Sequence, residues 1–504
     1  MLTPPPVGQA ITDSAPDYAW PRWLWLRALG LIFVSAFYSL AFQIHGLVGE
    51  RGILPATAYL ADLRYAVPGP TQLWYAPTVF WLGAGNRALT VVVAAGLMSS
   101  LLLTANVLPR LTTAASTVLF LSCIAVLQDF SSYQSDGMLL EAGFISIFFS
   151  PRGVRPGLGG DYPPSRASLF MLRWEWFRIY FESGVAKLAS GDVHWRNLTA
   201  MDEYYQNGPL PAWPGWYVQQ LPHAYHAATA ALTLVVELAV VWAILLPRRF
   251  RLACFIVVTA LQLGIIATAN YAFLNYLVLA LGVLLLDDGI ARRLGVHPVT
   301  HPREPRRTAL WPRRAEVAVL GWVLYATVIA FLAPRGAGVL VMPARLLEPF
   351  RIANAYGLFA SMTEARYEIE FQGSNDGGTT WTPYEFRYKP QDVLERPGVY
   401  APFQPRFDWN LWFASLGPWR ASPWVVATQQ RLIEGSPEVL ALFRHHPFPA
   451  APPSQVRTVL WQYWFTDRSE KRRTGAWWRR RPLGAFAGRL TRTPDGAFAL
   501  SESP

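Results

Sequence analysis

The chain has 504 residues, of which 52% are hydrophobic and only 15% are charged. This composition lies outside the range of ordinary soluble domains and indicates an integral membrane protein. The formal net charge of +11 does not indicate nucleic acid as a partner, because the arginines lie mostly in short loops between apolar segments. The two cysteines, Cys123 and Cys254, fall in apolar segments, so we expect no disulfide framework, zinc site of cysteines or thiol oxidoreductase.

Nine apolar segments are expected as membrane helices, since a helix needs roughly 20 mostly apolar residues, or about 17 when neighbours shelter its ends, to cross a bilayer. They cover residues 22–45, 87–107, 112–129, 136–150, 168–189, 225–246, 250–270, 271–287 and 315–334, and the fourth and eighth are short. The apolar stretch from Trp74 to Gly85 is shorter still and is expected at the membrane interface. We therefore predict an N-terminal segment, 1–21, followed by a helical membrane domain, 22–334.

The arginines predict the orientation of these helices, because short loops rich in Lys and Arg stay on the cytoplasmic side. With nine crossings, the loops that hold Arg110, Arg152, Arg248 and Arg292 fall on one side of the membrane. The N-terminus is then cytoplasmic, whereas the loop 190–224 and everything after about residue 335 are exoplasmic. The composition and the short loops suggest a bacterial cytoplasmic membrane.

The loop 190–224 contains the stretch HWRNLTAMDEYYQNGPLPAWPGWYVQQLP, which is polar, aromatic and rich in proline. Both ends of this loop join predicted membrane helices, so we expect a folded element at the exoplasmic face. Trp and Tyr dominate interface energetics, which makes this loop a candidate surface for a client protein. Its candidate residues are Asp192, His194, Trp195, Arg196, Asp202, Tyr204, Tyr205, Trp213 and Trp216.

The predicted helix 168–189 carries Glu175, Arg178 and Glu182 on one face, and ionisable groups at membrane depth are costly unless they face the bundle interior. Glu141 and Glu237, on neighbouring helices, are the natural further partners. One interpretation is an ion-pair network that fixes helix packing, with Lys187 extending to the interface. The other is a polar cavity that opens near Lys187, Asp192 and His194.

Signals for a metal or for a known catalytic motif are weak. Asp192, His194 and Asp202 lack a second nearby histidine, and His223 with His226 at spacing i, i+3 is more typical of an interface pair. Asn197 and Thr199 match a glycosylation sequon, which matters only in an endoplasmic reticulum. No GxSxG elbow, Walker loop or GxGxxG fingerprint stands in a suitable setting. We therefore expect no metal and no cofactor.

Beyond residue 350 the pattern changes to that of a β-rich α+β domain, predicted over 350–467. The segments ARYEIEFQGS and YEFRYKP alternate apolar and polar residues around NDGG, which predicts a hairpin between 367 and 388. DWNLWFASL and GSPEVLALFR favour helices, the second with Ser436 as N-cap and Pro437 after it, and VRTVLWQYWFTD favours a strand. The arginine-rich tail 468–504 is predicted to be disordered.

Long stretches of the chain resemble the lipase maturation factor family. They are the loop quoted above and the segments ANAYGLFASMTEARYEIEFQGSNDGGTTW, EFRYKP, PRFDWNLWFASLG, LIEGSPEVLALF and VRTVLWQYWFTD, which extend the resemblance over residues 20–467. The resemblance implies a multi-span membrane protein that assists the folding, assembly or maturation of secreted lipases, in the endoplasmic reticulum of eukaryotes. Its partners would be the lipid bilayer and a secreted client, with no role for nucleic acid.

A shorter stretch, RIYFESGVAKLASGDVHW, is similar to a helix end in vitamin K-dependent gamma-carboxylases, where a lysine acts in quinol-driven chemistry. By position, that lysine is Lys187. Two hypotheses therefore remain open: a non-enzymatic, chaperone-like factor, which we prefer, and a membrane enzyme with a charged cavity near Lys187 that acts on a quinone-like or lipid substrate.

Overall fold

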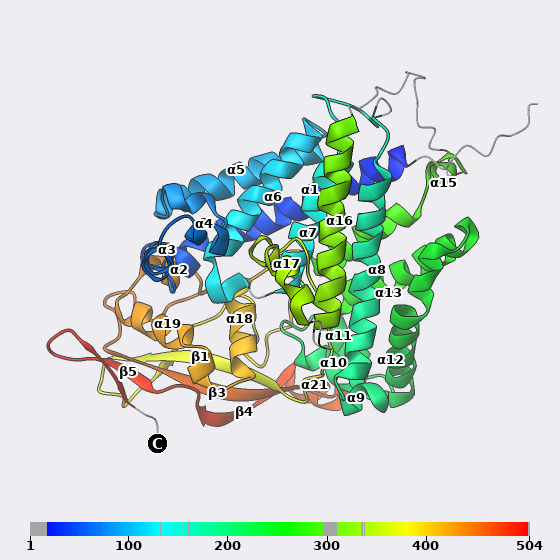
Figure 1. The fold of residues 1–504 in the computed structure, drawn as a ribbon. Helices are drawn as coiled ribbons and strands as arrows, with labels where there is room; N and C mark the ends of the chain where they lie inside the picture. Colours follow the sequence, from blue (N-terminus) through cyan, green and yellow to red (C-terminus); the bar gives the residue numbers. More distant parts are fainter. Residues whose placement is uncertain are drawn as a thin grey trace, which may run out of the picture.

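The computed structural model describes residues 18–131, 133–159, 162–293, 295, 310–333, 336 and 338–501. Most of the predicted N-terminal segment 1–21 lies outside these residues. Helices fill one part of the molecule, and a twisted sheet lies across one end of the helical bundle (Figure 1). The segment after the bundle therefore folds back onto it and does not hang from it as a separate body.

The helical part follows the predicted segments closely. In chain order it contains α1 (Ala19–Ala41), α2 (Ile44–Val48), α3 (Ala56–Ala66), α4 (Thr71–Tyr75), η1 (Val79–Leu82), α5 (Asn86–Thr104), α6 (Pro109–Val126), η2 (Gln128–Ser131), α7 (Gln134–Phe149), α8 (Arg166–Ala189), α9 (Val193–Arg196), α10 (Ala200–Asn207), α11 (Trp213–Gln219), α12 (His223–Leu238), η3 (Val240–Leu245), α13 (Arg248–Thr268), α14 (Leu274–Gly282), η4 (Val283–Leu285), α15 (Asp288–Arg293) and α16 (Leu310–Leu332).

Each of the nine predicted membrane segments is helical, but among the described residues only six helices are long and apolar enough to span a membrane: α1, α5, α6, α12 with η3, α13 and α16 from Arg313. The three others differ for physical reasons. The helix α7 has 16 residues, and α14 with η4 covers only Leu274–Leu285. The helix α8 is long enough, yet it carries several charged residues. Protein neighbours bury most of α7 and one side of α8, which lets these helices be short or charged.

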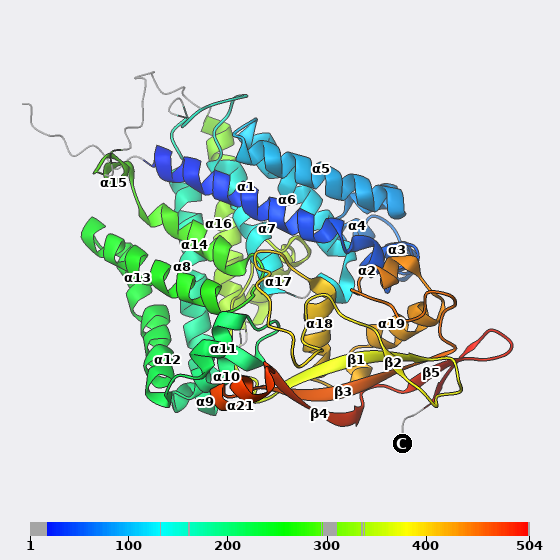
Figure 2. The same cartoon turned by 180° about the vertical axis from the view of Figure 1, so that it is seen from behind.

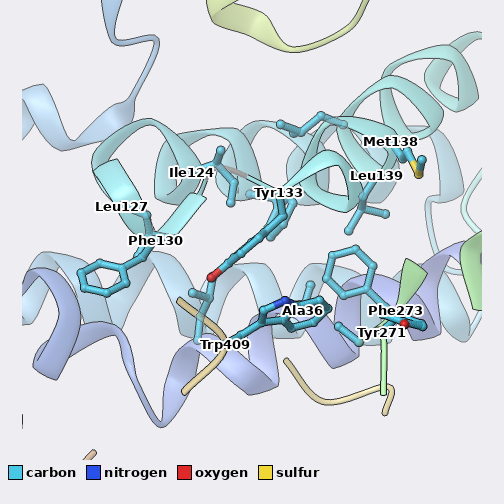
Figure 3. Packing of buried hydrophobic residues seen from close by; sticks show 14 of the residues in the cluster. Ala36, Ile124, Leu127, Phe130, Tyr133, Met138, Leu139, Tyr271, Phe273 and Trp409 are labelled. Carbon is cyan, nitrogen blue, oxygen red and sulfur yellow. The ribbon is translucent and has the colours of Figure 1, made fainter. Parts of the chain in front are cut away.

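The bundle core is aromatic where α1 crosses α5 and α6. Phe33 and Phe37 of α1 pack against Phe120 of α6 with ring centroids 5.9 and 5.8 Å apart. Gly96 of α5 lies directly over Phe37, where a Cβ atom would come within 2.2 Å of the ring. Figure 3 shows the adjoining region, in which Tyr133 lies beside Trp409 from the C-terminal part, 5.4 Å between rings. The core is therefore continuous from the bundle into the C-terminal domain.

The C-terminal domain is an antiparallel sheet with helices on one face. Its strands are β1 (Arg366–Ser374), β2 (Thr382–Pro383), β3 (Gln455–Phe465), β4 (Trp478–Ala485), β5 (Arg489–Arg492) and β6 (Phe498–Ser501), in the order β2-β1-β3-β5-β6 with β4 paired to β3. The connecting helices are η6 (Gly338–Leu340), α17 (Val341–Arg345), η7 (Glu348–Phe350), α18 (Arg406–Ser415), η8 (Trp419–Ala421), α19 (Trp424–Ile433), α20 (Pro437–Leu440) and α21 (Arg468–Thr474). Both views place α18 and α19 between the sheet and the bundle (Figures 1 and 2).

Several local predictions are confirmed. The hairpin joins β1 to β2 with Gln372 opposite Pro383, and the segment predicted as a strand is β3. The Ser436 side chain accepts a hydrogen bond from the backbone N–H of Val439 and so caps α20 as expected.

The predicted disorder of the tail 468–504 is wrong for the described residues, which end at Ser501. The tail forms α21, β4, β5 and β6, and β4 pairs with β3 from Val459 opposite Ala485 to Phe465 opposite Trp478. The ring of Trp478 is buried against Phe465, with centroids 4.6 Å apart, while the arginines of β4 remain at the surface. This strand is highly charged, and Trp478 is its one buried residue, yet it pairs along β3, so the domain extends past 467.

A buried polar junction between the bundle and the C-terminal domain

The charged residues of α8 are held by a segment from far along the chain, residues 353–363, which leads from η7 to β1. We call it the strap. Arg178 forms an ion pair with Glu141 of α7, and its second nitrogen donates to the carbonyl of Asn354 at 2.5 Å. Glu182 lies 3.8 Å from the same guanidinium group. The predicted pairing of Glu141, Arg178 and Glu182 is thus present, with the strap as an additional partner.

The strap also satisfies the carboxylates. Glu141 Oε2 accepts hydrogen bonds from the Asn354 backbone N–H (3.2 Å), the Asn354 amide (3.0 Å) and the Tyr356 hydroxyl (2.9 Å). Glu182 Oε2 accepts from the Tyr356 backbone N–H at 2.7 Å. Glu141, Arg178 and Glu182 are each buried. Buried charges of this kind are tolerated only when paired and hydrogen-bonded, so the strap is an integral part of the bundle.

Glu237 is not part of this network, because it pairs with Lys187 instead. Lys187 Nζ donates to Glu237 Oε1 at 2.9 Å, to Glu237 Oε2 at 2.8 Å and to the Leu358 carbonyl at 2.9 Å. The ring of Trp195 covers the ammonium group at 5.1 Å. An ammonium group has three donors, and these three acceptors match them.

This arrangement corrects both expectations for Lys187. The side chain does not extend to the interface, since only 2% of it is exposed. The strap and Trp195 enclose the ammonium group of Lys187, so this side chain is not an accessible base, and the geometry does not support the enzyme reading. Glu175, the remaining predicted residue, is fully buried, and neither of its carboxyl oxygens has a hydrogen-bond partner among the described residues.

The loop 190–224 folds into α9, α10 and α11, and it faces the strap more than the solvent. Trp195 Nε1 donates to the Phe359 carbonyl at 2.9 Å, and Asp192 Oδ2 accepts from the Met362 N–H at 2.7 Å. The side chains of Trp195, Tyr204, Tyr205 and Trp216 are buried, whereas Trp213 and Arg196 are exposed. Most aromatics that the sequence suggested for client contact therefore bind the protein's own C-terminal part.

The polar residues of this loop are separated into two small contacts. His194 lies 2.9 Å from the Thr199 hydroxyl and 3.4 Å from Glu364, and Asp202 lies 2.8 Å from His223. His226 is buried beside Tyr205. Within the part of the chain that the structure describes, no three His, Cys, Asp or Glu side chains are grouped to hold a metal ion.

Two arginines that the sequence reasoning missed fasten the C-terminal domain. Arg366, at the start of β1, is fully buried and donates to the carbonyls of Gln206 (3.2 Å), Gly208 and Pro209 (3.0 Å) in the loop 190–224. Arg406, at the start of α18, forms a bidentate ion pair with Asp136 of α7, with both distances 2.8 Å. Arg406 begins a segment rich in apolar residues, which is a signal that could have identified it, whereas Arg366 begins the mixed segment RYEIEFQGS, which gives no such signal.

A third buried group in this region is Asp408 of α18. Its Oδ1 accepts hydrogen bonds from the backbone N–H groups of Tyr388 and Lys389, both at 3.2 Å. Burial nevertheless raises the pKa of this carboxyl to about 6, because the charged form loses more hydration than the two donors return.

An aromatic cluster remains partly open where the loop meets the C-terminal domain. We call Trp213, Trp216, Tyr217 and Trp477 the aromatic corner. The ring of Trp216 lies 5.4 Å from Trp477 and 4.9 Å from Tyr217. Lys471 Nζ lies 3.3 Å from the centroid of Trp477. Trp213 is 37% exposed and Tyr217 is 47% exposed, so this corner presents aromatic surface that belongs to both regions.

These features define a class: a multi-pass helical membrane protein whose C-terminal α+β domain is locked onto one end of the bundle. Comparison with family models then gives its family. Residues 20–293 match the lipase maturation factor transmembrane domain, and residues 352–488 match the lipase maturation factor C-terminal domain. The chain belongs to the lipase maturation factor family.

Curated relatives agree over most of their length. Lipase maturation factor 2 of Homo sapiens is 31% identical, with 92% of this chain and 82% of the relative covered. Lipase maturation factor 2 of Gallus gallus is 31% identical over 92% and 80%. Lipase maturation factor 1 of Bos taurus is 30% identical over 93% and 88%. No solved structure matches this chain.

Proposed function

We propose that this protein assists the folding or maturation of a secreted client, such as a lipase, without itself being an enzyme. The observation that carries this proposal is that both domains match lipase maturation factors across nearly the whole chain. The closed environment of Lys187 agrees with it, because an ammonium group bound by three acceptors is poorly placed to act as a base.

We propose that the client contacts the aromatic corner, which the loop 190–224 forms together with Trp477 of the C-terminal domain. Trp and Tyr provide large contact area at low entropic cost, and they account for much of the binding energy in protein interfaces. Trp213 and Tyr217 are the exposed members, and the Arg396 guanidinium group lies 5.6 Å from the Trp213 ring. The buried residues Trp195, Tyr204 and Tyr205 then have a supporting role, since they fix the loop against the strap.

The test is a double substitution, Trp213→Ser with Tyr217→Ser, in cells that lack other lipase maturation factors and that co-express a secreted lipase. Because both side chains are partly exposed, we expect normal amounts of the membrane protein but a drop of about tenfold or more in active lipase per amount of lipase protein. The matched control is Tyr65→Ser, which removes an aromatic side chain that is 93% exposed in α3, far from the corner.

Two outcomes would contradict the proposal. If the wild-type chain fails to raise the specific activity of any co-expressed secreted lipase, the client class is wrong. If the double variant works as well as the Tyr65→Ser control while the wild type is active, the aromatic corner is not the contact surface.

We further propose that the C-terminal domain and the loop 190–224 face the exoplasmic side of a bacterial cytoplasmic membrane, with the N-terminus in the cytoplasm. The support is the placement of the arginines of the predicted cytoplasmic loops relative to the sheet, together with the positive-inside rule. Alkaline phosphatase fused to the C-terminus should then be active in intact cells. If the alkaline phosphatase fusion is inactive and a cytosolic reporter fused at the same place is active, the C-terminus lies in the cytoplasm and the proposed orientation is wrong.

A further inference from the structure

A cavity rich in arginine lies where α6, α8 and α16 begin, away from the polar junction. Its volume is about 630 Å³. Among the described residues, its charged lining consists of five arginines and one acid: Arg22, Arg110, Arg152, Arg166, Arg313 and Glu316. Such an excess of positive charge in a cavity next to membrane-spanning helices favours the binding of an anion.

Four of these arginines are available to a ligand. Within the described chain, Arg110, Arg152, Arg166 and Arg313 take part in no ion pair, and no side-chain hydrogen bond occupies their guanidinium groups. Arg22 has a different role. It is buried and donates to the carbonyls of Tyr162 (2.6 Å), Leu158 (2.9 Å) and Gly159 (2.9 Å), and so it fixes the loop that forms one wall.

The backbone adds to the positive potential of this cavity. Arg110 is the second residue of α6, Arg166 is the first residue of α8, and Arg313 is the fourth residue of α16. The N-terminus of a helix carries about half a positive charge and unpaired N–H groups, which favour phosphate and carboxylate groups. Three helices of at least 18 residues bring this end to the same place.

A long apolar groove begins at the same arginine. It has a volume of about 640 Å³ and follows α8 from Arg166 to Glu182, between η3 and the end of α16. Phe170, Trp174, Phe177 and Phe181 form a stacked row along it, with centroids 6.5, 5.7 and 5.2 Å apart. Trp174 Nε1 donates to Thr327 Oγ1 at 3.0 Å and thus ties this row to α16.

The dimensions of this groove suit one acyl chain. Sixteen residues separate Arg166 from Glu182, which corresponds to about 24 Å at about 1.5 Å per residue. One leaflet of the hydrocarbon core is only about 15 Å thick, half of the roughly 30 Å of the bilayer. The groove is therefore long enough to accept a chain whose head lies at Arg166.

We propose that the cavity and the groove together form a binding site for one anionic phospholipid. Its phosphate lies among Arg110, Arg152, Arg166 and Arg313, and one acyl chain lies on the aromatic row of α8. Basic pockets between membrane helices bind anionic head groups, and arginine matches phosphate geometry with paired donors. The occupant is a membrane lipid and not free phosphate, because the arginine cavity and the apolar groove share Arg166 in their lining, and an acyl chain suits the groove.

The test uses the full chain reconstituted in nanodiscs with equal amounts of phosphatidylglycerol and phosphatidylcholine, extracted into mild detergent and analysed by native mass spectrometry. The wild type should retain phosphatidylglycerol over phosphatidylcholine by about tenfold or more. Arg110→Ala should reduce this preference about 5-fold, and Arg110→Ala with Arg166→Ala should leave the two lipids retained about equally. Arg155→Ala is the matched control, since Arg155 belongs to the same exposed loop as Arg152 but does not line the cavity.

Two further arms separate the possible sources of the anion and the two parts of the site. Millimolar inorganic phosphate should leave the bound phosphatidylglycerol in place, and Val328→Trp, which fills the groove, should lower retention while the arginines remain. Equal retention of both lipids by the wild type, an equal loss in Arg155→Ala, or displacement by phosphate would each overturn the proposal. Thermal unfolding midpoints within a few degrees of the wild type establish that a loss of lipid is not a loss of fold.

Discussion

The bidentate pair between Arg406 and Asp136 offers a direct test of how the C-terminal domain is held. Both side chains are fully buried, and Arg406 also donates to the Phe130 carbonyl at 2.8 Å. The substitution Arg406→Met keeps much of the side-chain volume but leaves the Asp136 carboxylate without its partner. Removing one member of a buried ion pair costs about 3–5 kcal/mol, because an uncompensated charge remains inside the protein.

The double-mutant cycle distinguishes this cost from the cost of lost packing. In Arg406→Met with Asp136→Ala no charge is left unpaired, so the double variant should be more stable than the sum of the single variants predicts, by about 2 kcal/mol or more. The control is Arg444→Met, whose pair with Glu395 is 2.8 Å long but 43% and 39% exposed. Exposed pairs contribute about 1 kcal/mol or less.

The assay is thermal unfolding of the purified chain in mild detergent, followed by tryptophan fluorescence. If the C-terminal domain separates as a unit of about 150 residues, a loss of 3–5 kcal/mol lowers its midpoint on the order of 10 °C. The reasoning is refuted if Arg406→Met shifts the midpoint no more than Arg444→Met, or if the two single losses add without any coupling in the double variant.

Three further predictions concern the core, the junction and pH. Gly96→Val should destabilise the bundle by about 1–3 kcal/mol because its Cβ would meet the Phe37 ring, whereas Gly264→Val, with open space around it, should be close to neutral in the same unfolding assay. Lys187→Met should lower thermal stability and lipase maturation together, and Lys187→Met with Glu237→Leu should restore much of both; activity lost at full stability would instead indicate chemistry at Lys187. The raised pKa of Asp408, about 6 against 3.8, means that the folded state binds its proton more tightly than the unfolded chain. Its contribution to the free energy of unfolding is therefore greatest below about pH 4 and falls as the pH rises to about 6. Asp408→Asn should thus stabilise the protein by up to about 3 kcal/mol at neutral pH, and the variant and the wild type should differ little in stability below pH 4.

Local pattern was sufficient for much of the fold. All nine predicted membrane segments are helical, because runs of apolar residues exclude most other structures at that length. The hairpin around NDGG and the cap at Ser436 also depend on a few adjacent residues, and both are present. The charges of α8 were recognised as interior groups for the same reason, since a charge on a membrane helix has few other places to lie.

The partners of those charges could not be read from the sequence. Asn354 and Tyr356 lie 213 and 215 residues from Glu141, and Arg406 lies 270 residues from Asp136. The periodicity of hydropathy along the sequence does not predict contacts between residues so far apart, because it indicates only which side of a helix or strand is buried. From the sequence, the strap is therefore recognised only as part of the segment that resembles the family, and its structural role is not predicted.

What the sequence determined by itself is the class of molecule, its membrane segments and its family, since each depends on composition or on contiguous residues. Only the tertiary structure decided that the aromatic loop 190–224 is largely an internal support, that Lys187 is enclosed by Glu237 and Leu358, and that the arginine-rich tail completes the sheet. The physical reason is that burial belongs to the assembled chain: the same tryptophan or arginine lies at the surface or in the core according to which distant segment packs against it.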